Sequence, residues 1–319
     1  QVSDEVLFEI NRGVGKITLN RPKAINALTS DMFRSLDAKL DEWAEDERVE
    51  RVELTGVEGR GYCSGADIRA LRELIVEKGD GSPLREFLEL EYDVDAKIVR
   101  FPKQFDSYLF GVSMGGGLGL SMHRGGAGKR VAKADLRWAM PETGIGLWPD
   151  VGVTYELARM PGELGTHLAL TGAPIDAASA LYAGVITEVE GDVAPANSAL
   201  AKNQPWIDEC YSGDDPVEIL RRLEEHPIAA ARETAELIRG RCPMSVCVSL
   251  EAVRRAAKAK DVFEVLDQDM ALGRAWAKQP EEFVEGVRAQ LVDKDRQSRW
   301  RNQRVEEVDP AEVQARFDA

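Results

Sequence analysis

Met114-Gly115-Gly116-Gly117-Leu118-Gly119-Leu120 is the stretch that decides the fold, and it follows a predicted strand over residues 105–110. A helical pattern begins at about Gly116. Glycines between a strand and a helix let the backbone turn tightly and approach a ligand closely. They also leave amide N–H groups free at a helix N-terminus, where negative charge is favoured. The stretch therefore predicts a backbone site for a phosphate or a developing oxyanion, although close helix–sheet packing explains a lone glycine run equally well.

Two acids follow the glycine run in unusual surroundings. Glu142 lies in Met140-Pro141-Glu142-Thr143-Gly144, and Asp150 lies in Trp148-Pro149-Asp150-Val151-Gly152. A carboxyl group in an apolar pocket has a raised pKa, which suits general acid–base catalysis. Taken alone, each acid has an equally good structural explanation: Glu142 caps a helix, and Asp150 opens a turn.

The composition is that of a globular protein with an acidic balance. The chain has 319 residues, of which 44% are hydrophobic and 30% charged, and its net charge is −15. This charge argues against nucleic acid or an anionic membrane as a partner. We find no apolar run of transmembrane length and no basic-then-apolar leader. Because the chain starts at Gln1, an organellar presequence removed before that residue stays open.

The cysteines and histidines argue against several site types. The cysteines do not have zinc spacing, so we expect reduced thiols and a cytoplasmic location. The histidines fall in no nucleophile elbow and no His-Glu-x-x-His pattern, which disfavours a serine or cysteine triad and a histidine-bound metal. These residues are Cys63, Cys210, Cys242, Cys247, His123, His167 and His226.

Alternating patterns at the N-terminus predict a layered α/β fold. Residues 6–10 and 14–19 read as a β-hairpin. A helix follows, capped by Thr29 or Ser30, and residues 52–55 form a further strand. Strand, helix and strand in succession are typical of a crossover unit.

Further along, residues 59–68 form a second glycine-rich loop that leads into a helix. Glu91 lies in a helix over residues 84–99, within an acidic run that is ordinarily a solvated face. The pattern after Asp150 is mostly helical, and residues 191–205 mark a boundary. Two basic faces, one around Arg254 and one around Trp300, are of a kind that is usually solvated but could meet ligand phosphates.

Three segments in this order resemble the crotonase (enoyl-CoA hydratase/isomerase) superfamily: Ile17–Leu28, Gly61–Ile68 and Gly115–Gly117. The resemblance implies an α/β fold of repeated β-β-α units, the ClpP/crotonase fold, with a helical C-terminal region. It places an acyl-CoA-binding catalytic core at residues 1–191 and a helical region that covers the site or mediates assembly at residues 192–319.

The resemblance also implies where an acyl-CoA would bind. The backbone N–H groups of Ala66 and Gly116, with Gly115 beside them, would hold the thioester oxygen as it gains negative charge. Such donors are each worth about 3–4 kcal/mol in a transition state. The loops that would flank the adenosine and phosphate end contain Lys23, Ala24, Asp67 and Ile68.

The acids select a branch of the superfamily. Its hydratases use two glutamates, and Gly119 stands at the position of one of them, whereas Glu142 matches the other. The usual two-glutamate addition of water is therefore not available. The chain instead resembles the 3-hydroxyisobutyryl-CoA hydrolase branch, in Met114–Ser121, in Met140–Gly152, in Glu91-Tyr92 and in a C-terminal segment over residues 283–295.

That branch implies hydrolysis of 3-hydroxyisobutyryl-CoA to 3-hydroxyisobutyrate and CoA, as in valine catabolism. Glu142 would act as base or nucleophile, Asp150 would orient the substrate hydroxyl or water, and Glu91 would support that end. No metal or redox cofactor is needed, because CoA is part of the substrate. The alternatives are an enoyl-CoA hydratase or isomerase that uses Glu142, and an acyl-CoA-binding protein without turnover.

Two features could set this chain apart within the branch. The segment over residues 123–129 looks expanded, so the acyl preference could differ. Superfamily members often assemble through their C-terminal helices, so a homo-oligomer is expected, although the longer tail argues against the usual trimer.

Overall fold

The computed structural model describes residues 4–123 and 128–319, so residues 124–127 of the expanded segment lie outside the described part. The chain forms two compact units, each built from separate stretches of sequence. The first comprises Gln1–Asp67, Glu89–Ala139 and Pro174–Ser198, and the second comprises Ile68–Leu88, Met140–Ala173 and Ala199–Ala319. The division after residue 191 that the sequence suggested stays a prediction.

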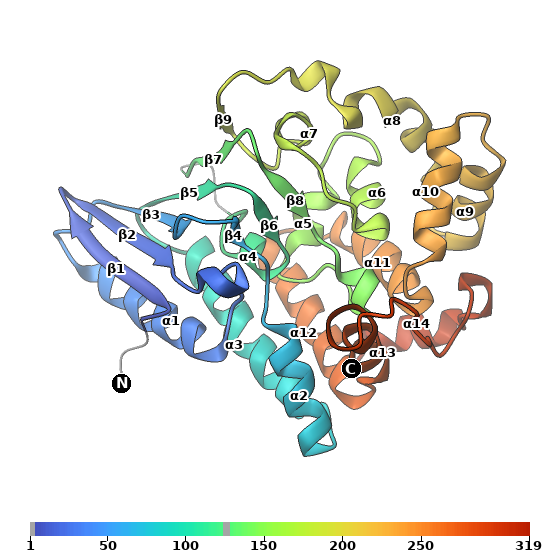
Figure 1. Ribbon diagram of the computed structural model, residues 1–319, viewed down its shortest axis with the longest axis horizontal. Helices are drawn as coiled ribbons and strands as arrows, with labels where there is room; N and C mark the ends of the chain where they lie inside the picture. Colours follow the sequence, from blue (N-terminus) through green and yellow to red (C-terminus); the bar gives the residue numbers. More distant parts are fainter. Residues whose placement is uncertain (1–3, 124–127) are drawn as a thin grey trace. The chain divides into compact units, whose positions relative to one another are not determined.

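The first unit is built on a six-stranded sheet with the order β1-β2-β3-β5-β7-β9 (Figure 1). The predicted hairpin is confirmed, because β1 and β2 pair in antiparallel fashion. From β2 onward all neighbours are parallel. In β2 and β3 buried residues alternate with half-buried ones, as expected for strands with one face on the core. The strands are β1 (Val6–Asn11), β2 (Val14–Leu19), β3 (Arg51–Gly56), β5 (Gln104–Leu109), β7 (Arg130–Lys133) and β9 (Glu188–Glu190).

A second, parallel sheet of three strands completes this unit: β4 (Gly61–Cys63), β6 (Val112–Met114) and β8 (Arg137–Ala139). Each successive pair, β3-β4, β5-β6 and β7-β8, places its first strand in the large sheet and its second in the small one. This alternation confirms the predicted repeated units. The prediction of a loop over residues 61–63 was wrong, because this segment is fully buried and pairs with β6.

The helices of the first unit follow the expected local rules, with one exception. In α1 (Ser30–Glu45), the Thr29 hydroxyl accepts a hydrogen bond from the Met32 amide, so the predicted cap is confirmed. The helix predicted from Gly116 is only one turn of regular helix, α4 (Gly116–Gly119), because three of its four residues are glycines. The unit also contains α7 (Ala177–Ala183) and residues 89–99 of α3 (Ser82–Val99).

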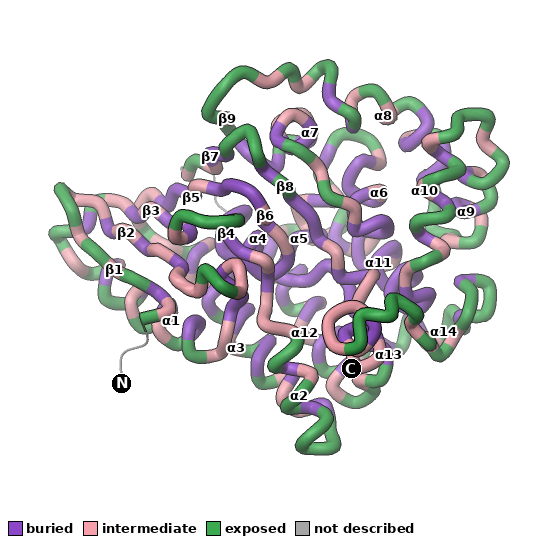
Figure 2. The backbone as a smooth tube through the Cα atoms, in the orientation of Figure 1, coloured by how far each residue is buried: buried purple, intermediate pink, exposed green. Residues whose placement is uncertain are grey.

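The second unit is helical, as predicted for the chain after Asp150. Its helix α11 is buried along nearly its whole length (Figure 2). The predicted boundary over residues 191–205 was too long, because α8 begins at Ala199 and includes Pro205. The helices are α2 (Ile68–Lys78), α5 (Val153–Leu157), α6 (Leu164–Thr171), α8 (Ala199–Cys210), α9 (Pro216–Glu225), α10 (Ala229–Arg239), α11 (Pro243–Ala256), α12 (Val262–Lys278), α13 (Glu281–Val287) and α14 (Pro310–Arg316).

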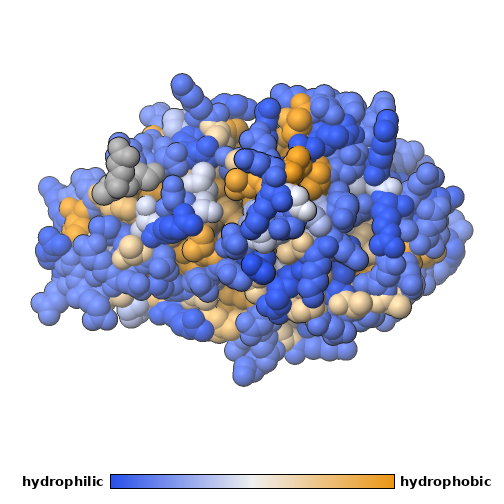
Figure 3. Space-filling model, turned by 90° about the horizontal axis from the view of Figure 1, so that it is seen from below, coloured by the Kyte–Doolittle hydropathy of each residue, from blue (hydrophilic) through white to orange (hydrophobic). Residues whose placement is uncertain are grey.

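Hydrophilic side chains cover most of the face of the molecule seen in Figure 3. Apolar patches are scattered among them on this face. Among residues 4–123 and 128–319, no helix combines the length and the apolar character that crossing a bilayer requires. All four cysteines are buried and free, as expected for reduced structural thiols.

The close packing of α4 on β4 generates a prediction about stability. A methyl group built on Gly117 would lie 2.6 Å from Cys63 Cβ and 2.8 Å from Cys63 Sγ. We therefore expect Gly117→Ala to lower the free energy of unfolding by about 1–3 kcal/mol, measured by urea denaturation. Gly59→Ala is the control, because the nearest atom to its new methyl group would be Val57 O at 3.9 Å. Equal stability of the two variants would contradict this account of the packing.

Candidate active site

The first candidate donor is the backbone amide of Ala66, in the loop between β4 and α2. Leu28 pairs with this loop as an isolated bridge: its N–H donates to Gly65 O at 2.8 Å, and Asp67 N–H donates to Leu28 O at 2.8 Å. These bonds fix the backbone on both sides of Ala66. Within the described part of the chain, no hydrogen bond takes up the Ala66 amide itself. The loop therefore offers the free donor that the sequence predicted there.

The second candidate donor is the amide of Gly116, the first residue of α4. Gly115 precedes it with a φ of 56°, and the Gly115 amide donates to Ala139 O at 3.2 Å. The Gly116 amide has no acceptor in the described residues, as expected at the start of a helix. A methyl group built on Gly65 would lie 3.3 Å from Met114 O and 3.5 Å from Gly116 N. The structure thus brings the two predicted donor segments together within the first unit.

Asn26 is a residue of this region to which the sequence analysis assigned no role. It is 1% exposed, and its Nδ2 donates to Tyr62 O at 2.9 Å, while its Oδ1 accepts from the Arg21 amide at 2.7 Å. Asn26 and its neighbour Ile25 both have positive φ angles. Asn26 therefore connects the loop after β2 to β4 and fixes how the donor segment is presented.

Three of the four residues predicted to flank the adenosine and phosphate end lie in the same unit as this connection. Lys23 is exposed and Ala24 half-buried in a 3-10 turn, and Ala24 O accepts from the Ser64 hydroxyl at 2.9 Å. Asp67 forms an ion pair with Arg21 at 3.2 Å. The fourth residue, Ile68, begins α2 in the second unit and is half-buried.

Glu91 lies on α3 and is 2% exposed. The solvated face that its acidic run indicated was therefore wrong, whereas the family resemblance already placed Glu91 at the substrate site; that role stays a prediction. Its Oε2 occupies the place that a methyl group on Gly116 would need. Glu91 also contributes, after burial, to raising the pKa of Cys63 to about 12. The structure thus places the Glu91 carboxyl group directly against one predicted donor. The acidic run did not indicate this burial, because the burial depends on the apolar packing of α3.

In the second unit, Glu142 opens a 3-10 turn over Glu142–Ile145 and is 7% exposed. Its side chain does not cap this turn, and its Oε1 has no hydrogen-bond partner in the described residues. Burial, and then the negative charge of Asp150, hold the pKa of Glu142 well above its ordinary value. A raised pKa of this kind suits a carboxyl group to general acid–base catalysis.

Asp150 is 9% exposed and lies in a tight turn that leads into α5. Its carbonyl oxygen accepts from the Val153 amide at 3.1 Å. Val151 and Gly152 have φ angles of 54° and 73°, in the left-handed region. A β-branched residue with such a φ is a genuine outlier. Asp150 therefore lies in a turn, as the non-catalytic explanation of this residue predicted. Its charge also helps to raise the pKa of Glu142.

Asp269, on α12, was missed by the sequence analysis. It is fully buried, and its two carboxylate oxygens accept from Trp148 Nε1 at 2.9 Å and from the Gly152 amide at 2.7 Å. Burial and the charge of Asp150 hold its pKa well above the ordinary value. One pattern in the sequence could have indicated its burial: at helical spacing, Asp269 falls on the same face of α12 as the buried residues Val265 and Leu272.

Other contacts fix the segment that contains both acids. Trp276 Nε1 donates to Gly146 O at 2.7 Å, and the rings of Trp148 and Trp276 pack with their centroids 4.9 Å apart. The Cys242 amide donates to Thr143 O at 2.9 Å. Helices α11 and α12 therefore support the two acid-bearing turns through backbone carbonyls and aromatic contacts.

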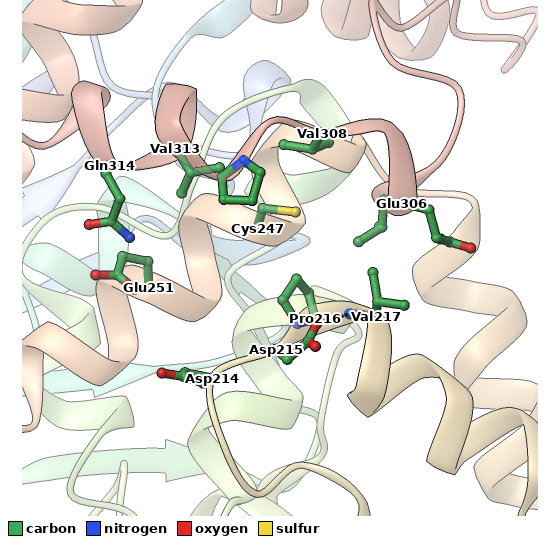
Figure 4. A pocket seen from close by; sticks show the side chains of 12 residues that line it. Asp214, Asp215, Pro216, Val217, Cys247, Glu251, Glu306, Val308, Val313 and Gln314 are labelled. Carbon is green, nitrogen blue, oxygen red and sulfur yellow. Dashed lines mark hydrogen bonds between the residues drawn. The ribbon is translucent and has the colours of Figure 1, made fainter.

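A cavity of about 240 Å³ lies elsewhere in the second unit, and none of the predicted site residues lines it. Figure 4 shows acidic side chains around an apolar interior that contains Cys247. No lining residue is basic, so the negative phosphates of CoA would be repelled there. The acids are Asp214, Asp215, Glu251 and Glu306.

The basic face predicted around Arg254 is already engaged within the protein. Arg254 pairs with Glu163 at 2.9 Å and donates to Tyr211 O at 2.6 Å, and Arg255 pairs with Glu251 at 2.8 Å. These guanidinium groups would have to give up existing bonds before they met a ligand phosphate.

Comparisons with known proteins agree on one superfamily and disagree on the reaction. A family model described as enoyl-CoA hydratase/isomerase matches residues 14–192 and 185–317. The mitochondrial 3-hydroxyisobutyryl-CoA hydrolase of Homo sapiens is 31% identical, covering 99% of this chain and 89% of its own length. The hydrolase of the same name from Danio rerio is 33% identical, covering 94% of this chain and 86% of its own length.

Two solved structures share the whole fold with a TM-score of 0.91. One is described as a carnitinyl-CoA dehydratase from Mycobacterium thermoresistibile, at 39% identity, covering 99% of this chain and 96% of that one. The other is described as an enoyl-CoA hydratase from Rhodobacter sphaeroides, at 35% identity, covering 98% of this chain and 97% of that one. These matches confirm the predicted crotonase fold with its helical C-terminal region.

The contact between Gly116 and Glu91 predicts coupling between the two positions. Gly116→Ala should lower the melting temperature, because its methyl group would displace the Glu91 carboxylate. Glu91→Asp withdraws the carboxylate by one methylene group and should recover part of this loss in the double variant. We expect a coupling energy of about 1–2 kcal/mol in a double-mutant cycle, measured by urea denaturation. Strictly additive effects would contradict the contact.

The raised pKa of Glu142 predicts a pH-dependent stability difference. Below about pH 4.5 the Glu142 carboxyl group is neutral in the folded and in the unfolded protein. Above this pH it ionises in the unfolded chain, whereas in the folded protein it stays neutral up to its raised pKa. The wild-type protein therefore loses stability as pH rises toward the folded-state pKa, by about 1.4 kcal/mol for each unit of pKa difference. Glu142→Gln removes this loss, so its melting temperature should exceed that of wild type at pH 7.5.

The difference in melting temperature between Glu142→Gln and wild type should shrink toward zero as the pH falls to 4.5. Glu77→Gln, at an exposed position on α2, is the control and should show no such trend. A constant difference across the pH range would show that Glu142 is not held neutral by its surroundings.

Proposed function

Because the chain belongs to the enoyl-CoA hydratase/isomerase family, also called the crotonase superfamily, we propose that it hydrolyses an acyl-CoA thioester, with 3-hydroxyisobutyryl-CoA as the substrate. The observation that supports this choice most directly is the set of acids. Burial and the charge of Asp150 raise the pKa of Glu142, and by the family resemblance Gly119 stands at the position of the second hydratase glutamate. One proton-transferring carboxyl group with an acidic neighbour suits hydrolysis better than two-acid hydration.

The free amides of Ala66 and Gly116 supply the electrostatic part of the proposal. Attack on a thioester carbonyl places negative charge on its oxygen, and two fixed N–H donors stabilise that charge. Neither amide has an acceptor within the described part of the chain, so both are available to a ligand. We propose that Gly115, through its left-handed backbone, sets the direction of the Gly116 donor.

Glu142 would supply the attacking group in one of two ways. As a base, it takes a proton from water, the hydroxide attacks the carbonyl carbon, and the C–S bond breaks as CoA leaves and accepts the proton. As a nucleophile, its carboxylate forms a mixed anhydride with the acyl group and releases CoA; water then cleaves the anhydride. Both routes require ionised Glu142 and consume one water, and neither needs a metal or a redox cofactor.

Asp150 and Glu91 would act on the acyl end of the substrate in this proposal. Asp150 is buried enough to hold a substrate hydroxyl or a water molecule by a strong, charge-assisted hydrogen bond. Glu91 lies against Gly116 and would support the same end. We propose that Lys23, Ala24, Asp67 and Ile68 contact the adenosine and phosphate end of CoA, as the family resemblance implies.

The relatives are described with different reactions, so we also consider a second candidate function. The curated relatives are described as 3-hydroxyisobutyryl-CoA hydrolases, whereas the two solved structures are described as a dehydratase and a hydratase. Removal or addition of water at an enoyl-CoA double bond is therefore the alternative. The glycine at position 119 speaks against it in its two-glutamate form. The cytoplasmic location and the assembly through C-terminal helices stay predictions.

A direct test measures free-thiol release from 3-hydroxyisobutyryl-CoA and, in parallel, loss of enoyl absorbance from crotonyl-CoA. We expect thiol release by the wild-type protein and little hydration. Glu142→Gln should lower kcat for thiol release by about 10²–10⁴-fold, because it cannot accept a proton or attack the carbonyl.

The matched control is Glu251→Gln, which removes an acid of the second unit that acts on neither Glu142 nor Asp269. This variant should keep wild-type rates. Hydration of crotonyl-CoA without thiol release would overturn the hydrolase proposal in favour of the alternative. Binding of CoA esters with neither reaction would indicate a binding protein.

The effect of Asp150 on Glu142 predicts a shift in the pH profile. Because Asp150 helps to raise the pKa of Glu142, and ionised Glu142 is the active form, kcat/KM should rise with pH through that pKa. Asp150→Asn removes the repulsion, so this acid limb should move to lower pH, while the rate on the plateau falls. Glu251→Gln should leave the limb unchanged. An unmoved limb in Asp150→Asn would show that the two carboxyl groups do not interact during the reaction.

A further inference from the structure

We propose that Asp269 is a positioning residue that holds the turn bearing Asp150 from both sides. It accepts one hydrogen bond from the residue two positions before Asp150 and one from the residue two positions after it, at 2.9 Å from Trp148 Nε1 and 2.7 Å from Gly152 N. Two acceptor oxygens on one rigid group therefore bracket the Asp150 turn. The catalytic consequence of this contact rests on the proposed function, whereas the contact itself does not.

The turn needs such a constraint because its backbone is strained. Val151 has a φ of 54°, although it is β-branched and fully buried. Residues in this region of conformational space persist only where the surrounding structure holds them there. The bond from Gly152 to Asp269 acts on the residue next to Val151. Loss of this bond would let the turn relax and would change the direction of the Asp150 side chain.

Asp269 is itself well fixed. It lies on the buried face of α12, a helix over Val262–Lys278, and is fully inaccessible to solvent. Trp276 of the same helix packs against Trp148, whose centroid lies 4.9 Å away, and donates to Gly146 O. One helix therefore contacts the segment at residues 146, 148 and 152, so the position of α12 determines the position of the Asp150 turn.

A buried carboxyl group at position 269 costs free energy that an apolar side chain would not, so packing alone does not explain Asp269. It lies in the field of another acid, Asp150, and within the described part of the chain its hydrogen bonds come from two neutral N–H groups. A buried carboxyl group beside a second acid destabilises the fold unless it is well hydrogen-bonded. A carboxylate offers two acceptor oxygens for these two N–H groups, whereas the side-chain amide of asparagine offers one.

The test compares the full-length wild-type protein with Asp269→Asn, which keeps the shape but loses one acceptor. We expect kcat for thiol release to fall by roughly 10²-fold, because small displacements of catalytic groups cost that much, with KM changed less than about threefold. Hydrogen exchange at the amides of residues 150–153 should become at least about tenfold faster. Trp148→Phe removes the other hydrogen bond but keeps an aromatic ring, and should show the same kcat-dominated loss.

Leu223→Ala, in the fully buried position of α9, is the control for a general loss of stability. It should lower the melting temperature but leave both kcat and exchange at residues 150–153 near wild type. The proposal is overturned if Asp269→Asn exchanges like wild type at these amides, or if its kcat loss is no larger than that of Leu223→Ala. If the wild-type protein releases no thiol, the proposed function fails, and the exchange measurement still decides whether Asp269 holds the turn.

Discussion

Burial of negative charge is the constraint on which the candidate site depends. Glu142 and Asp269 are almost or completely removed from water, and each feels the charge of Asp150. Solvation by water is lost at such positions, so the protein must either hold the groups neutral or supply donors. At Asp269 it supplies an indole N–H and a backbone N–H. At Glu142, no hydrogen-bond donor from the described residues reaches Oε1, and the pKa of the carboxyl group is raised.

The first unit meets a different constraint, the close approach of backbones. Side chains are absent at Gly65, Gly116 and Gly117, where a methyl group would press on the neighbouring loop, on Glu91 or on Cys63. These approaches bring the loop of Ala66 against the start of α4, where helix geometry leaves amides without partners. The glycine run therefore serves packing and exposes donors at once, so the two explanations that the sequence left open are not alternatives.

Local patterns in the sequence predicted those elements whose structure depends on neighbouring residues. Alternation and turn residues predicted the hairpin at β1 and β2, and the cap at Thr29 predicted the start of α1. Burial of single polar residues is set by distant partners, so the acidic run around Glu91 indicated a solvated face, and only the family resemblance indicated a pocket. Asp269 went unnoticed for the same reason. The acids of the Met140–Gly152 segment were found because glycine, proline and tryptophan mark unusual backbone there, whereas an acid within a regular helix has no such mark.

The fold alone does not choose the reaction. Structures with the same architecture throughout are described as a dehydratase and a hydratase, and relatives of similar length are described as hydrolases. Backbone donors suit all of these reactions, because each places negative charge on a thioester oxygen. The reaction is decided by which carboxyl groups are present and what state their surroundings impose. With glycine at position 119, the proposed function assigns proton transfer to Glu142, whose pKa is raised by burial and by the charge of Asp150. In this proposal the turn that holds Asp150, which two hydrogen bonds tie to α12, acts in the reaction although it lies outside the glycine loops.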